Sequence, residues 1–225
     1  VSILCPVSEH RKLTDEASDY YQSLNIKVVQ VVYSEPILPT WPKLEERYCS
    51  EEIASHVRDA DIVYFQDLHA NAFHLVREKR FIATSFPICI SILHGSSQLV
   101  NHLEQQHPSI PDGLILNFME KYSVQHSDFV ISPSHFMPKW LRQHGWKLPE
   151  DHIRIMGYPF LQEVEDHIVN HNSEFRRIIF FGRFDTGKGF DIFVKALRSL
   201  KLKQEIVFLG SDGIHQYESA SNAAN

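Results

Sequence analysis

Short apolar runs alternate with longer amphipathic stretches along the 225-residue chain. Eight runs are rich in β-branched and aromatic residues and have the length of single strands. They occupy residues 1–7, 26–33, 60–66, 86–93, 128–134, 153–159, 176–182 and 204–210. Their apolar positions are nearly continuous, which is typical of parallel strands that helices cover on both faces. The pattern predicts an α/β fold with a Rossmann-like, doubly wound parallel sheet.

Helix signals lie between the predicted strands. Thr14 can accept a hydrogen bond from a backbone amide, so it is placed as the N-cap of a helix. Glycine and proline mark where other helices end and where loops begin. The segments with these signals are residues 14–25, 114–127 and 134–145. We expect them to form helices that pack on the sheet.

The polar, acidic residues 159–175 separate two series of strands and helices. Their weak apolar periodicity is typical of an interdomain linker. We therefore predict one Rossmann-like domain at residues 1–158 and a second at residues 176–225. The second holds only a β-α-β unit, which is too small to bury its own sheet, so we expect an incomplete domain. Val1 opens directly in a strand-like run, which favours a start inside a longer chain.

Composition narrows the classes of function. A formal charge of -6 argues against a nucleic-acid partner or a basic membrane-surface protein. No apolar run has the roughly 20 residues that a membrane-spanning helix needs. Cys5, Cys49 and Cys89 lie far apart, which is typical of buried thiols in a reducing compartment. We expect a globular, cytoplasmic protein.

The stretch "IIFFGRFDTGKGFDIF", residues 178–193, has the glycine and lysine spacing of a phosphate-binding P-loop. The matching residues are Gly182, Gly187 and Lys188. A P-loop also needs Ser or Thr directly after the lysine to coordinate magnesium, and Gly189 stands there instead. The spacing therefore does not indicate a P-loop.

The same loop is still a candidate anion site. It lies between a predicted strand and a predicted helix whose apolar face is Phe190, Phe193, Val194, Leu197 and Leu200. Free amides at a helix N-terminus, together with the charges of Arg183 and Lys188, favour a diphosphate. A tight turn with two solvated charges is the alternative, and the loop by itself does not decide between them.

Polar residues also follow two other predicted strands. Asp67 and His69 come directly after one of these strands. The residues that follow the other strand are His94, Gly95, Ser96 and Ser97. The carboxyl ends of parallel strands meet at one edge of a sheet, so we expect these residues to share a rim where ligands bind. A single histidine in such a place is more often structural than catalytic, and only several converging groups indicate a site.

Together these segments resemble the GT-B fold retaining glycosyltransferases of the "group 1" family. Residues 61–69 are similar to that family's "DvvhvHdwh" strand, and residues 87–95 to "Pvv.t.Hg". Residues 120–134 are similar to "E...l..AD.vi.vS". The most specific likeness is between residues 178–191 and "ilfvGRl...KGvd".

The resemblance implies transfer of a sugar from a nucleotide-diphosphate sugar to an acceptor, with retention at the anomeric carbon. It implies a cleft between two Rossmann-like domains and no essential metal or other cofactor. The donor diphosphate would be bound by Gly182, Arg183 and Lys188. The catalytic residues would be His94, Arg183 and Lys188, with His94 on the donor sugar. The cleft or acceptor side would be lined by Asp67, His69, Gly95 and Ser96.

The sequence departs from the family in two places. The family has a glycine-rich loop after its first strand, and residues 1–13 contain no glycine. Its pair of acidic residues for the donor sugar and ribose belongs after "IVFLGSDG", where Glu218 and its neighbours do not match. We therefore expect these 225 residues to be a fragment that is inactive alone, and the complete protein to be the transferase.

Two other functions stay open. One is a non-catalytic module of GT-B ancestry that binds a nucleotide sugar or a partner, and the other is a GT-B nucleotide-sugar epimerase. The 14 histidines suggest a metal site, but none of them pairs with Cys or Glu at ligand spacing. A metal site is therefore the weakest alternative. The expected partners are a nucleotide-sugar donor and a sugar or other acceptor. Peripheral membrane association of the full-length enzyme also stays open.

Overall fold

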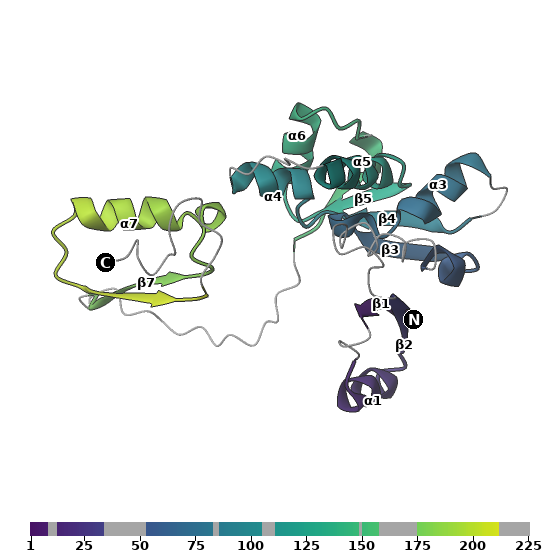
Figure 1. Cartoon of the computed structure of the whole chain (residues 1–225), viewed down its shortest axis with the longest axis horizontal. Helices are drawn as coiled ribbons and strands as arrows, with labels where there is room; N and C mark the ends of the chain where they lie inside the picture. The colour runs from purple at the N-terminus through teal and green to yellow at the C-terminus, as the bar shows by residue number, and fades with distance from the viewer. Residues whose placement is uncertain are drawn as a thin grey trace. The chain divides into compact units, whose positions relative to one another are not determined.

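The computed structural model describes residues 1–8, 13–33, 53–82, 86–104, 111–148, 150–157 and 175–211. The chain divides into two compact units (Figure 1). The first consists of Val1–Leu99 and Pro108–Tyr158, and the second of Val100–His107 and Pro159–Asn225.

All eight predicted strands form, and all their pairings are parallel. They are β1 (Ser2–Ser8), β2 (Lys27–Tyr33), β3 (Ile62–Gln66), β4 (Ile88–Ile92), β5 (Phe129–Ser132), β6 (Ile153–Ile155), β7 (Arg177–Phe181) and β8 (Glu205–Leu209). They make three sheets, with the orders β1-β2, β3-β4-β5-β6 and β7-β8. The α/β class with parallel sheets is confirmed, and this arrangement is compatible with a Rossmann-like fold.

Helices connect the strands. They are α1 (Asp15–Ser23), α3 (Phe73–Phe81), α4 (Ser97–Leu103), α5 (Pro111–Gln125), α6 (Phe136–Gln143) and α7 (Phe190–Ser199), with single 3-10 turns η1 (Leu68–Ala70), η2 (Glu150–His152) and η3 (Thr186–Lys188). Thr14 caps α1 as predicted, because its hydroxyl accepts a hydrogen bond from the Ala17 amide at 3.3 Å. None of the described helices combines the length and the hydropathy that crossing a bilayer requires.

The core of the first unit lies between the four-stranded sheet and the helices that follow its strands. One buried cluster consists of Leu93, Leu99, Val124, Val130, Met137, Trp140, Leu141, Trp146 and Leu148. A second consists of Ala54, Val57, Ala72, Leu75, Val76 and Cys89. The thiol of Cys89 is fully buried, as predicted, and its burial raises its pKa to about 11. Cys49 and the side chain of Cys5 lie outside the described residues.

The other face of this sheet is only partly covered by the described residues, so the expected burial on both faces stays a prediction there. Ile62, Tyr64 and Ile88 are 47%, 59% and 42% exposed. The strand order supplies the reason. Strands β3 to β6 follow one another in chain order, and right-handed crossovers that all advance in one direction place every helix on the same face. Cover on both faces needs a reversal of strand order, which this sheet lacks.

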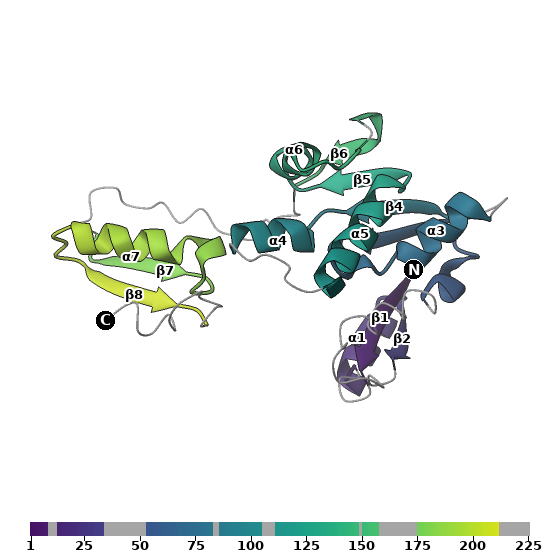
Figure 2. The same ribbon diagram turned by 45° about the horizontal axis from the view of Figure 1, so that its top comes forward.

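The second unit has a small aromatic core beneath α7, which lies over one face of β7 and β8 (Figure 2). Phe190 and Val194 of α7 are buried there, and the residues packed against them are Phe180, Phe184 and Phe208. The predicted apolar face of this helix therefore forms, except at its end. Leu200 is 56% exposed because the backbone leaves the helix at this C-cap residue.

Candidate functional site

Asp67 lies at the carboxyl end of β3 and holds the loop that follows β4. Its side chain is 1% exposed, and its backbone amide donates to the carbonyl of Ile92 at 3.1 Å. Its Oδ1 accepts a hydrogen bond from the His94 amide at 2.9 Å, and the Gly95 amide is 3.3 Å from Oδ2. Burial raises the pKa of Asp67, while these two amides and the nearby His94 oppose the rise.

Glu120 of α5 is fully buried and connects two loops at the same rim. Its Oε1 accepts hydrogen bonds from the His69 amide at 3.0 Å and from the Ser97 hydroxyl at 2.7 Å. Its Oε2 accepts from the Ser97 amide at 2.8 Å. Burial raises the pKa of Glu120 to about 7, although the bonds from Ser97 and His69 lower it.

Sequence reasoning missed Glu120 as a site residue, although the chain holds a signal for it. The buried stripe of α5 contains Leu116, Met119, Ser123 and Val124. Glu120 stands inside that stripe, four residues after Leu116 and four before Val124. An acidic residue at a core position of a helix needs partners that compensate its burial, so the position indicates a polar network.

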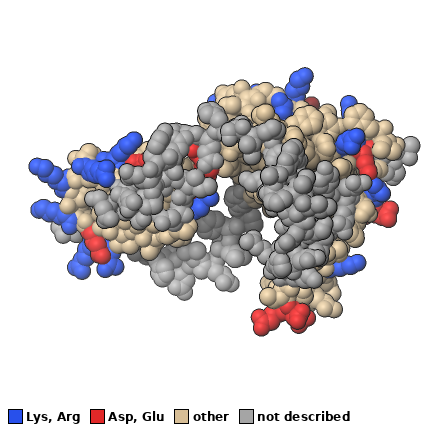
Figure 3. Space-filling view, viewed as in Figure 1, with Lys and Arg blue, Asp and Glu red and all other residues tan. Residues whose placement is uncertain are grey.

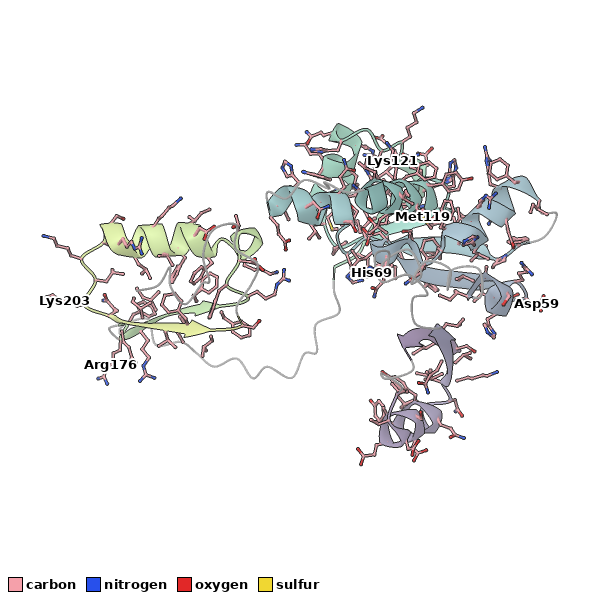
Figure 4. All side chains as sticks on the ribbon, viewed as in Figure 1. Asp59, His69, Met119, Lys121, Arg176 and Lys203 are labelled. Carbon is pink, nitrogen blue, oxygen red and sulfur yellow. The ribbon has the colours of Figure 1, made fainter. Side chains whose placement is uncertain are left out.

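The two histidines of the rim are exposed above these buried carboxylates. His69, which Figure 4 labels, has a φ of 67°, and Ala70 after it has a φ of 53°. Left-handed backbone at non-glycine residues costs about 1–3 kcal/mol each and is found mainly at functional sites. The bond from the His69 amide to Glu120 helps to hold this strained turn. His94 begins the neighbouring loop, directly before Gly95.

The structure places Gly95 and Ser96 below the surface. Gly95 has a φ of 138°, a conformation that side chains rarely adopt. Ser96 is 1% exposed, and its hydroxyl accepts a hydrogen bond from the Leu99 amide at 3.3 Å. These two residues therefore shape the turn between β4 and α4. The predicted rim residues of the first unit thus lie on two adjacent loops, and Asp67 and Glu120 hold them by hydrogen bonds.

The predicted diphosphate loop lies in the second unit, between β7 and α7. The side chain of Arg183 is 57% exposed, and Lys188 is exposed as well. Asp185, which sequence reasoning missed, is 1% exposed between them. Its Oδ1 accepts from the Lys188 amide at 2.8 Å, and its Oδ2 lies 2.9 Å from Arg183 Nε. That second contact is an ion pair without hydrogen-bond geometry. Asp185 therefore fixes the turn, and it holds Arg183 together with Glu104, whose Oε1 lies 3.6 Å from the guanidinium.

The amides at the start of α7 are already bonded within the loop. The Gly189 amide donates to the Thr186 carbonyl at 3.0 Å, and the Phe190 amide donates to the Asp185 carbonyl at 3.2 Å. Asp191 in the first helical turn accepts from the Thr186 hydroxyl at 2.7 Å. The expectation of free amides is wrong for Gly189 and Phe190, as it is for Lys188. Anion binding at this loop would depend on the two cationic side chains.

Two glycines bring the ends of β7 and β8 into close contact. The Gly182 amide donates to the Leu209 carbonyl at 2.9 Å. A Cβ atom on Gly210 would lie 1.8 Å from the Gly182 carbonyl oxygen. Since atoms that are not bonded to each other do not approach so closely, any side chain at Gly210 must push the strand ends apart.

We expect Gly210→Ala to destabilise the second unit by about 1–3 kcal/mol, as overpacking commonly does. Amide hydrogen exchange in β7 and β8 measures the loss. Gly157→Ala is the matched control, because a Cβ atom there meets nothing within 4 Å. Equal protection of β7 and β8 in both variants would contradict the close approach.

Lys and Arg side chains also gather at the opposite end of the second unit, on the left in Figure 3. Those at the starts of β7 and β8 and at the end of α7 are Arg176, Arg177, Arg198, Lys201 and Lys203. Figure 4 labels Arg176 and Lys203 there. Arg183 and Lys188 lie beyond the other end of β7, so they are separate from this basic group.

Within the described ranges, no three His, Cys, Asp or Glu side chains gather closely enough to hold a metal ion. No protein-family model matches the chain, and no curated protein sequence matches it.

Proposed function

We propose that the protein is a retaining glycosyltransferase of the GT-B type that uses a nucleotide-diphosphate sugar as its donor. The observation that carries the proposal is the loop between β7 and α7. It presents two exposed cations, Arg183 and Lys188, at the carboxyl end of a parallel strand, and a buried carboxylate fixes its turn. Open α/β sheets bind their ligands at such strand ends.

The chemistry of the loop fits a leaving nucleoside diphosphate. When the bond from the anomeric carbon to the diphosphate breaks, negative charge grows on the phosphate oxygens. The cations of Arg183 and Lys188 stabilise that charge, and a well-placed donor of this kind is worth about 3 kcal/mol in the transition state. The acceptor oxygen forms the new bond to the anomeric carbon, its proton passes to an oxygen of the departing diphosphate, and the free nucleoside diphosphate leaves.

The rim of the first unit supplies the groups for the sugar. His94 is exposed at the end of β4, and its backbone is fixed by the buried Asp67. With the backbone of His94 fixed, its imidazole can donate or accept a hydrogen bond at a sugar hydroxyl. In this proposal His94 contacts the donor sugar, while His69 lies on the acceptor side. The donor needs no metal, and the proposed compartment is the cytoplasm.

Release of the nucleoside diphosphate tests this function. A panel of UDP-glucose, UDP-N-acetylglucosamine, GDP-mannose and ADP-glucose is incubated with the complete protein and simple sugar acceptors. A transferase releases the free diphosphate and forms a glycoside with the anomeric configuration of the donor, both visible by nuclear magnetic resonance. An inverted product would contradict retention. Binding without release would favour the non-catalytic module, and a changed sugar without a glycoside would favour the epimerase.

A further inference from the structure

Two loops of the first unit are joined through one buried carboxylate. The loop after β3 carries His69, and the loop after β4 carries His94. Glu120, on a third element, accepts a hydrogen bond from the His69 amide and two from Ser97. A single side chain from α5 therefore touches both loops that present a histidine.

Asp67 adds a second link between the same loops. It belongs to the first loop, yet its carboxylate accepts from the amides of His94 and Gly95 in the second. Neither Asp67 nor Glu120 has a lysine or arginine among its hydrogen-bond partners in the described residues. In the described residues these two buried acids are held by amides and one hydroxyl, and the charge of Asp67 raises the pKa of Glu120.

The Ser97 hydroxyl can serve either protonation state of Glu120. It donates to Oε1 when the carboxylate is ionised. A hydroxyl also accepts, so it can take a hydrogen bond from a protonated Oε1 without any movement of the heavy atoms. Oε1 still has a lone pair for the His69 amide, and Oε2 still accepts from the Ser97 amide.

We propose that Glu120 is a positioning residue that holds the His69 and His94 loops in one arrangement, and that the Ser97 hydroxyl reverses its hydrogen bond when Glu120 gains or loses a proton. The arrangement itself is independent of any ligand. Its effect on sugar binding rests on the proposed function, in which these loops carry the donor and acceptor contacts.

The surroundings of Glu120 set the pH at which this reversal occurs. Burial raises its pKa to about 7, the Ser97 and His69 bonds lower it, and the charge of Asp67 raises it. Asp67 of the first loop acts on Glu120 through its charge, His69 reaches Glu120 through its backbone amide, and the charge of His94 acts on Asp67. From α3, Phe73 packs on the rings of Phe118 and Tyr122, and the charge of Arg80 acts on His126 directly after the end of α5. The carboxyl group therefore changes charge close to neutral pH.

The sign of the linked stability change follows from this raised pKa. Between about pH 4.5 and pH 7 the folded protein keeps a proton on Glu120 that the unfolded chain has lost. Stability from this group is therefore greatest below the unfolded pKa. It falls as the pH rises through about 7.

Amide signals in a pH titration by ¹⁵N nuclear magnetic resonance test the proposal. The amides of His69 and Ser97 are expected to share one midpoint near pH 7. Ser97→Ala should move that midpoint of the His69 amide upward, because the hydroxyl bond lowers the pKa of Glu120. Ser123→Ala is the control. It removes a buried hydroxyl of the same helix that donates to the Met119 carbonyl at 2.7 Å, and should leave the midpoint in place.

Glu120→Gln extends the test. Glutamine has a single acceptor oxygen, so the shared midpoint should disappear and the exchange protection of either the His69 amide or the Ser97 amide should fall at least tenfold. Should Glu120→Gln fail to fold, Ser97→Ala decides alone. A His69 midpoint that Ser97→Ala leaves unchanged would overturn the proposal. No sugar is needed for this titration, so it can succeed even when the donor panel shows that the transferase proposal is wrong.

Discussion

Arg183→Ala is expected to lower the transfer rate about 100-fold or more in the complete transferase, because it removes one fixed charge from the leaving diphosphate. The loss should appear mainly in kcat, since the charge on the phosphate oxygens grows as the bond breaks. Steady-state release of nucleoside diphosphate from the preferred donor measures it. The buried Asp185 holds the guanidinium beside the loop, so the cation is already in place before the donor binds.

Arg176→Ala is the matched control for this prediction. It removes an arginine from the start of β7, at the end of the strand opposite to Arg183. A general electrostatic effect of the Lys and Arg side chains in the second unit would lower the rate in both variants alike. A near-normal rate for Arg183→Ala would remove this residue from the site.

Phe190→Ala should cost the second unit about 3–5 kcal/mol, the usual loss for a buried phenylalanine. Phe190 is 1% exposed, and its ring centroid lies 5.3 Å from that of Phe180 and 5.7 Å from that of Phe208. It also lies 5.1 Å from the ring of Phe184, which stands in the loop beside Arg183. The substitution therefore leaves a cavity under the loop as well as under the strands.

Hydrogen exchange of the β7 and β8 amides reports this loss for the second unit alone, whatever the stability of the first. Ile192→Ala on the same helix is the control. Ile192 is 74% exposed, so its truncation should change stability by less than about 0.5 kcal/mol. Similar protection in the two variants would show that the aromatic cluster is not the core of this unit.

The strands were predictable from sequence because each is a short β-branched run between turn signals. Local chemistry also specified the Thr14 cap, and helical spacing specified the buried side of α7. The cover of the sheet was not predictable in this way. Near-continuous apolar strands indicate burial, but the face that is covered depends on strand order, which no local pattern contains.

The candidate site was predictable in part for a similar reason. Residues that follow strands, such as Asp67 and His94, are placed by topology alone, so sequence order was enough to bring them to one rim. The carboxylates that hold the loops of this site by hydrogen bonds come partly from elsewhere in the chain. Glu120 reaches His69 across 51 residues, and such a contact is visible only once α5 is packed. Asp185 was overlooked because an aspartate that caps a single 3-10 turn has no recognisable sequence motif.

The open apolar faces of the sheets follow from the same topology. In the second unit, Ile179 and Phe181 of β7 are 53% and 85% exposed on the side away from α7. Parallel strands of this kind are normally buried on both sides. The aromatic core therefore carries the packing of the described β-α-β unit alone, which is why we expect the loss at Phe190 to be large.

Binding of a nucleoside diphosphate tests the central claim most directly. UDP and GDP are titrated with the protein, and the ³¹P signals are followed together with the amides of Gly182 and Lys188. The proposal predicts that the phosphate signals shift and that these two amides respond, with affinity at least tenfold weaker in Arg183→Ala than in Arg176→Ala. Phosphate signals that do not move, or that move equally in both variants, would contradict a donor diphosphate site at this loop.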